Sequence, residues 1–85
     1  MGEQGKAKRQ FTYKQGHYLS FIYYYNKILG YPPAEADIQR YFKVTPPAVH
    51  QMIRTLEKRG LIQKVPYEPR NLRVLVSPKE LPELE

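Results

Sequence analysis

Residues 44–62 constrain the fold of this chain most, because they carry the signals of one short helix that runs into a strand. Thr45 is a favourable N-cap, since its hydroxyl accepts a hydrogen bond from a first-turn N–H, and Pro46 suits the first helical position. Gly60 supplies the stop signal. Between them, apolar residues recur at the spacing of one helical face, namely Val49, Met52, Ile53 and Leu56.

The other side of this helix, residues 45–59, is small at its start, polar in its middle and basic at its end. This is the surface expected of a helix that lies in the major groove of DNA. Gln51 is the best candidate to bind adenine and Arg54 to bind guanine or a phosphate, while Ala48 suits a thymine methyl group. His50 is either a solvated polar residue or a base contact. The predicted DNA contacts on the helix are Thr45, Ala48, His50, Gln51, Arg54 and Lys58.

A second helix is predicted upstream, over residues 32–42. It opens with prolines and carries Glu35 and Asp37 in its first turn, where the helix dipole favours negative charge. Only Lys43 and Val44 separate it from the helix of residues 45–59. Two short helices joined by so tight a turn indicate a helix-turn-helix, in which the first helix braces the second.

At this point the sequence resembles the winged-helix DNA-binding family, and more narrowly the amino-terminal domain of LexA-type repressors; MarR-like winged helices are the second resemblance. The strongest points are Gly30-Tyr31-Pro32-Pro33, Ala36-Asp37-Ile38, Thr45-Pro46 and Leu56-Glu57-Lys58-Arg59-Gly60-Leu61-Ile62. The resemblance implies a repressor that binds double-stranded DNA. Two departures prevent a direct transfer of base contacts: the chain is one residue shorter than the LexA pattern between Pro33 and Gly60, and Pro47 stands where a polar base-reading side chain is expected.

Two β-prone runs follow the helices, at residues 61–65 and 72–76, and they predict an antiparallel hairpin. Residues 66–71 between them are too long and too rich in proline for a two-residue turn, so we expect a projecting loop. In the winged-helix family this loop is the wing, and the resemblance implies DNA contacts for Arg70, Asn71 and Arg73. The predicted fold class is mostly α with a small β component: a three-helix bundle followed by a β-hairpin wing.

The charge of the chain favours a polyanionic partner. The net charge is +6, but Glu80, Glu83 and Glu85 lie at the end, so residues 1–79 carry 14 basic against 5 acidic side chains. We predict a disordered basic tail over residues 1–10, the DNA-binding domain over 11–77, and an acidic tail or the start of a linker over 78–85. The absence of cysteine and of a signal peptide or membrane span predicts a cytoplasmic, nucleoid-associated protein without membrane contact.

Catalytic and metal chemistry find little support in the sequence. Ser20 and Ser77 have no base partner, and the carboxylates are scattered over helix starts and the tail. The two histidines, His17 and His50, have no third ligand nearby. We therefore predict no enzymatic activity, no cofactor and no metal site.

The first predicted helix, residues 12–29, has two apolar faces. Its core face holds Tyr18, Leu19, Ile22, Tyr25 and Leu29. A second face, about 120° away at 100° per residue, holds His17, Phe21, Tyr24 and Ile28. Either the outer Leu75 and the tail residues Leu81 and Leu84 cover this second face, or it is a subunit interface, since helix-turn-helix proteins commonly bind DNA as dimers.

Two other uses of a winged helix compete with DNA binding: a protein-protein interaction module within a larger assembly, and RNA binding. The placement of charge separates the first of these from DNA binding, because an interaction module has no reason to collect cations around one helix and the wing. The cations gathered there are Arg54, Lys58, Arg59, Lys64, Arg70 and Arg73.

Overall fold

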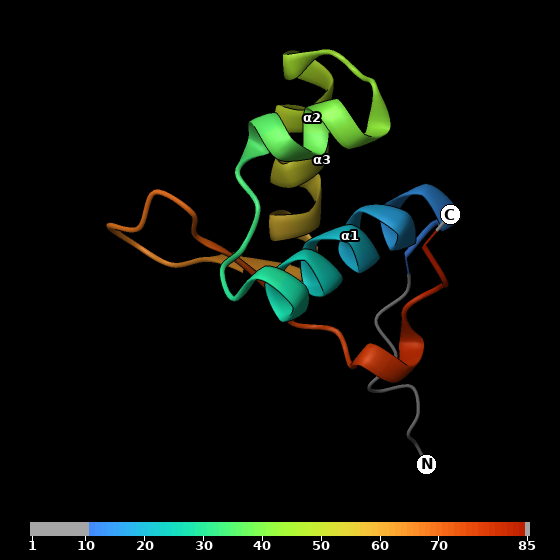
Figure 1. Cartoon of the computed structure of the whole chain (residues 1–85). Helices are drawn as coiled ribbons and strands as arrows, with labels where there is room; N and C mark the ends of the chain where they lie inside the picture. The colour runs from blue at the N-terminus through green and yellow to red at the C-terminus, as the bar shows by residue number, and fades with distance from the viewer. Residues whose placement is uncertain (1–10, 85) are drawn as a thin grey trace.

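The computed structural model describes residues 11–84, so the predicted disordered tail of residues 1–10 lies outside the described residues. Within them, three α-helices are followed by a two-stranded antiparallel sheet and a short 3-10 helix (Figure 1). The helices and the β-hairpin confirm the predicted fold class. The elements are α1 (Tyr13–Leu29), α2 (Glu35–Phe42), α3 (Pro46–Lys58), β1 (Ile62–Lys64), β2 (Leu72–Val74) and the 3-10 helix η1 (Pro78–Glu80).

α1 is closed at both ends by local hydrogen bonds. The Thr12 hydroxyl accepts from the N–H of Gln15 at 3.0 Å, and the Gln15 side-chain oxygen accepts from the N–H of Thr12 at 3.0 Å. This reciprocal pair is a capping box. At the other end the chain turns at Gly30, whose φ of 86° is the left-handed conformation that glycine adopts without strain. The predicted range of this helix is thereby confirmed to within one residue.

α2 begins at Glu35, three residues later than the prolines indicated. Pro33 disfavours helical geometry at Pro32, because the residue before a proline is pushed toward extended conformations. Ala34 is also extended, with φ −84° and ψ 166°, and it occupies the cap position. The side chain of Asp37 supplies the cap, since its Oδ2 accepts from the N–H of Ala34 at 2.9 Å. The predicted start at residue 32 was therefore wrong, whereas the predicted end at Phe42 is confirmed.

The turn between α2 and α3 contains a left-handed residue, Lys43, with φ 56°. Val44 follows, and the Thr45 hydroxyl then accepts from the N–H of Ala48 at 3.4 Å. α3 ends at Lys58, followed by the cap residue Arg59 and then by Gly60, whose φ is 75°. The N-cap and the glycine stop read from the sequence are both confirmed, and α2 and α3 form the predicted helix-turn-helix.

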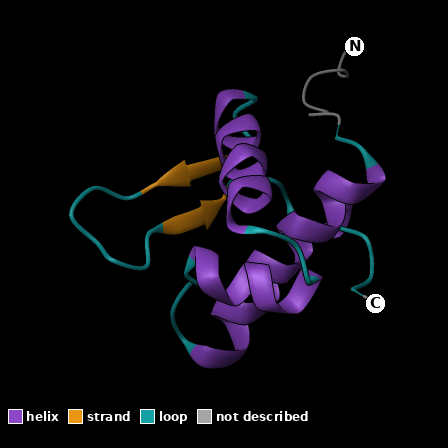
Figure 2. Ribbon diagram, turned by 90° about the horizontal axis from the view of Figure 1, so that it is seen from above, coloured by secondary structure: helices purple, strands orange, loops and turns teal. Residues whose placement is uncertain are grey.

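The two strands pair with Ile62 opposite Val74 and Lys64 opposite Leu72. They are shorter than the predicted runs, but hydrogen bonds from the N–H of Val65 to the carbonyl of Asn71 and from Leu75 to Leu61 extend the pairing beyond both ends. The loop after Val65 projects from the body of the molecule on the side away from the last described residues (Figures 1 and 2). The predicted wing is therefore present.

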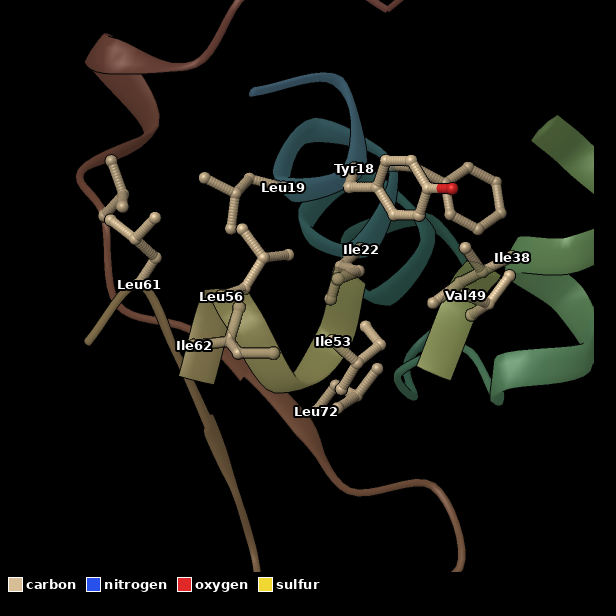
Figure 3. Close-up of a cluster of buried hydrophobic side chains, with 12 residues drawn as sticks. Tyr18, Leu19, Ile22, Ile38, Val49, Ile53, Leu56, Leu61, Ile62 and Leu72 are labelled. Carbon is tan, nitrogen blue, oxygen red and sulfur yellow. The ribbon is translucent and has the colours of Figure 1, made fainter. Parts of the chain in front are cut away.

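A single apolar core joins all these elements. α1 packs against α2 and β2, and α3 packs against α2 and β1. The two strands of the hairpin therefore contact two different helices, α1 and α3. Val49, Ile53 and Leu56 of α3 are fully buried, and Figure 3 shows them facing side chains from the other helices and the strands. The predicted core face of α3 is confirmed for these three residues, and its fourth member, Met52, is partly buried against the core. In α1 the prediction holds for Tyr18, Leu19 and Ile22, but Tyr25 is half-buried and Leu29 is exposed, because α1 extends past the core at its end.

The segment expected as an acidic tail or linker start packs against α1. The buried hydroxyl of Ser20 donates to the carbonyl of Pro82 at 2.7 Å, and Leu81 and Leu84 are partly buried against the core. At Gly16 an added Cβ would lie 3.1 Å from Cδ of Pro82 and 2.9 Å from the ring of Phe11. The folded unit therefore continues past residue 77 to the end of the described chain.

The second apolar face of α1 is covered in part, and the element that covers it is α2. Phe21 is only 8% exposed, because its ring stacks on Tyr41 at 4.5 Å and meets Phe42 edge-on at 5.7 Å. The expectation that Phe21 belongs to a face left open or covered by the tail was wrong, since α2 covers it. Tyr24 and Ile28 stay open, with 36% and 76% of their surfaces exposed.

Candidate nucleic-acid interface

The outer face of α3 forms the floor of an open hollow of about 490 Å³. Burial of the opposite face fixes the helix, so the polar side chains necessarily point outward. Arg54, Lys58 and Lys64 bring three positive charges to the hollow, against one negative charge from Glu57. The lining residues are His50, Gln51, Arg54, Thr55, Glu57, Lys58 and Lys64.

Four of the predicted DNA contacts thus meet in one place: His50, Gln51, Arg54 and Lys58. Thr45 and Ala48 are exposed near the start of the same helix, where the first turn of a recognition helix contacts bases. The major groove of DNA is about 12 Å wide and admits one α-helix, so α3 can lie in it. The hollow therefore brings amide and imidazole side chains, which are groups that can hydrogen-bond to base edges, next to side chains of positive charge.

Lys64 also lines this hollow. The sequence places it among the cations gathered around the helix and the wing, but the predicted DNA contacts do not include it. It lies two residues after the buried Ile62, on the face of β1 that packs toward α3. The period-2 alternation of a strand was the signal that places it there. Thr55 and Glu57 also line the hollow and were not predicted, because their position follows from how β1 meets α3.

His50 has a partner in α2. Its Nδ1 lies 3.6 Å from Oε1 of Glu35, and both side chains are exposed. The contact joins α3 to the first turn of α2. It leaves the other ring nitrogen, Nε2, available for a partner outside the protein.

The predicted wing contacts differ in orientation. Arg73 is exposed on β2, opposite Gln63, and Asn71 is half-buried at the base of the wing. The guanidinium of Arg70 turns back to the helical bundle: its Nη1 lies 2.8 Å from Oδ2 of Asp37. The structure thus separates Arg70 from the other wing residues.

Asp37 occupies a strongly hydrogen-bonding environment. The N–H of Ala34 and, less strongly, the guanidinium of Arg70 hold the pKa of this carboxyl group below its ordinary value, and they outweigh the partial burial that raises it. Arg40 adds a second ion pair, with its Nη2 2.6 Å from Oδ1. Asp37 is therefore ionised at neutral pH and links the start of α2 to the wing.

Across positions 11–84, no group of three or more His, Cys, Asp or Glu side chains is arranged to hold a metal ion. No helix among the same residues is both long enough and apolar enough to span a membrane.

A helix-turn-helix whose second helix carries an exposed polar and basic face, followed by a β-hairpin wing, defines a winged-helix DNA-binding domain. The comparison with protein families agrees: the family model of the LexA DNA-binding domain matches residues 8–71. This chain belongs to that family.

Relatives of this chain are named LexA repressor. The LexA repressor of Thermosipho africanus (strain TCF52B) is 34% identical over 71 residues, which cover 84% of this chain and 36% of that protein. The LexA repressor of Thermotoga neapolitana is 37% identical over 71 residues, covering 84% of this chain and 36% of that protein. This chain thus spans about a third of the length of the relatives that it matches.

Proposed function

We propose that this protein is a transcriptional repressor that binds a specific sequence of double-stranded DNA. The observation that carries the proposal is the hollow on α3, where Gln51 lies beside the three cations Arg54, Lys58 and Lys64. Amide side chains read adenine in the major groove, and cations bind the flanking phosphates. The relatives named LexA repressor support the regulatory part of the proposal.

The proposed contacts fall into two groups. Base reading comes from α3, in which Gln51 binds adenine, Arg54 binds guanine or a phosphate, and Ala48 contacts a thymine methyl group. Phosphate or minor-groove binding comes from the hairpin. The full proposed set is Thr45, Ala48, His50, Gln51, Arg54, Lys58, Lys64, Asn71 and Arg73.

The binding unit in this proposal is residues 11–77, with the packed segment 78–84 as a brace on α1. A repressor of this class acts where the chromosome is, so we place the protein in the cytoplasm, on the nucleoid. The net charge of +6 supports such a location, because it favours association with a polyanion.

Salt dependence tests the proposal directly. If the four cations Arg54, Lys58, Lys64 and Arg73 all contact phosphates, log affinity for duplex DNA should fall against log salt with a slope of about −3.6. Fluorescence anisotropy with a labelled duplex measures this slope. No duplex binding at low salt, or a slope near zero, would favour the protein-protein interaction module, and tighter binding to single-stranded or hairpin RNA than to duplex DNA would favour the RNA alternative.

We further propose that the protein binds DNA as a homodimer through the open part of α1. Tyr24 and Ile28 support this, since they are exposed apolar residues one helical turn apart. His17, half-buried against the ring of Tyr13, would border the interface. Phe21 lies beneath Tyr41 and takes no direct part.

Analytical ultracentrifugation of Tyr24→Glu tests the dimer. The variant should sediment as a monomer with a nearly unchanged melting temperature, and it should lose more affinity for a duplex with two half-sites than for one half-site. Asn26→Glu, which adds the same charge to another exposed position of α1, is the matched control. A wild type that is monomeric at high micromolar concentration would exclude this interface.

A further inference from the structure

Arg70 contacts three separate segments of the helical bundle. Its Nη1 donates to Oδ2 of Asp37 at 2.8 Å, to the carbonyl of Pro32 at 3.2 Å and to the hydroxyl of Tyr25 at 3.4 Å. The guanidinium carbon lies 4.9 Å from the centre of the Tyr31 ring, a cation–π distance. One wing side chain therefore contacts the end of α1, the α1–α2 link and α2.

Asp37 is the other half of this contact, and its side chain is only 10% exposed. Its Oδ2 receives both Arg70 and the N–H of Ala34, at the start of α2. The start of the bracing helix and the wing thus share one carboxylate oxygen. Movement of the wing would take Arg70 away from a mostly buried carboxylate and leave Arg40 as its remaining ion-pair partner, which is costly.

The wing has few other ties to the helices. Tyr67, Glu68 and Pro69 are exposed, and the loop is closed at its base by the backbone hydrogen bond from Val65 to Asn71. Within the described residues, Arg70 is the member of 66–71 whose side chain bonds to the helical bundle. The orientation of the wing relative to α3 therefore depends on Arg70.

We infer that Arg70 is a positioning residue rather than a phosphate contact, and that its pair with Asp37 sets the angle at which the wing meets DNA. The inference rests on the proposed DNA-binding function. It makes a counterintuitive prediction, because Asp37 repels phosphates and yet should increase affinity for DNA. A phosphate contact made through Nη1 of Arg70 would instead have to break the three hydrogen bonds that this nitrogen donates.

The first test is Asp37→Asn, which keeps an oxygen to accept from the N–H of Ala34 but removes the charge that holds Arg70. We expect affinity for duplex DNA to fall on the order of 3- to 10-fold, which lies in the lower part of the range for the loss of one coupled pair. Glu68→Gln is the matched control, since it removes the same charge from an exposed wing position, and it should bind slightly more tightly. Equal or tighter binding by Asp37→Asn would overturn the inference.

The second test changes the arginine of the pair, Arg70, and leaves α2 unchanged. Arg70→Ala should weaken binding but leave the slope of log affinity against log salt unchanged, whereas Arg73→Ala should make the slope shallower by about 0.9. The double variant Asp37→Asn/Arg70→Ala should bind no more weakly than either single variant. A shallower slope for Arg70→Ala, or additive losses in the double variant, would overturn the inference.

Two controls keep the outcomes distinct. Melting temperatures and the amide NMR spectrum of each variant show whether α2 and α3 are intact, and for both substitutions we expect shifts confined to residues 66–71 and to the residues around Asp37 that Arg70 contacts. If the wild type does not bind duplex DNA at all, the proposed function fails. If the wild type binds with the expected salt slope and Asp37→Asn binds equally well, only the positioning role of Arg70 fails.

Discussion

α3 and the wing are the two parts of this domain that face the proposed DNA, and they are held in place by different forces. α3 is fixed by apolar burial, with Val49, Ile53 and Leu56 fully enclosed by the core. The wing is fixed by polar contacts that converge on the Arg70 side chain. Apolar packing carries no charge that protons neutralise or salt screens, whereas an ion pair is weakened by both. The helix should therefore keep its place under conditions that release the wing.

The largest effect should come from the apolar anchor of α3. Ile53→Ala removes a fully buried side chain and should lower the free energy of unfolding by about 2–5 kcal/mol, because it leaves a cavity. Urea unfolding followed by circular dichroism measures the loss. Met52→Ala, at the half-buried neighbouring position, should cost clearly less. Equal losses at the two positions would mean that burial does not fix α3 as described.

The next effect separates reading by α3 from anchoring by the hairpin. Gln51→Ala should cost about 1–3 kcal/mol of binding on the preferred sequence and little on random duplex DNA. Arg73→Ala should weaken binding to both, since a phosphate contact carries no sequence information. Competition titrations against a selected site and a random duplex provide the comparison. Equal losses on both duplexes for Gln51→Ala would remove Gln51 from the base-reading set.

A pH titration should show the polar character of the wing attachment. Because the folded-state pKa of Asp37 is lowered, its carboxylate stabilises the fold above the ordinary aspartate pKa of about 3.9, and this stability is lost as pH falls through the folded-state value. The wild type should therefore be more stable than Asp37→Asn at about pH 7, and the two should converge at about pH 2. A stability difference that persists unchanged in acid would contradict this assignment.

The smallest effect concerns the cap of α3. Thr45→Ala should lower the free energy of unfolding by about 0.5–1 kcal/mol, through loss of the hydrogen bond from the N–H of Ala48. Thr45→Ser keeps the hydroxyl and should restore the stability. If Thr45→Ser regains stability without regaining DNA affinity, the methyl group of Thr45 contributes to the DNA contact; if it regains both, the role of Thr45 is limited to its hydroxyl.

The sequence by itself determined the features that depend on near neighbours. Thr45 and Gly60 mark the ends of α3 because caps and left-handed turns act within a few residues. The helical period determines which residues of α3 form the buried apolar face. It also determines which side chains between Ala48 and Lys58 point away from the core. The helix-turn-helix and the hairpin were predictable for the same reason.

Tertiary structure decided what joins residues far apart in the chain. Arg70 meets Asp37 across 33 positions, and Ser20 meets Pro82 across 62. Phe21 is covered by Tyr41 of α2, although its own helix marks it only as one member of a second apolar face. A local pattern states which side chains share a face, but it does not state which element packs on that face. That choice follows from the joint burial of apolar surface and pairing of charges, which only the assembled fold brings together.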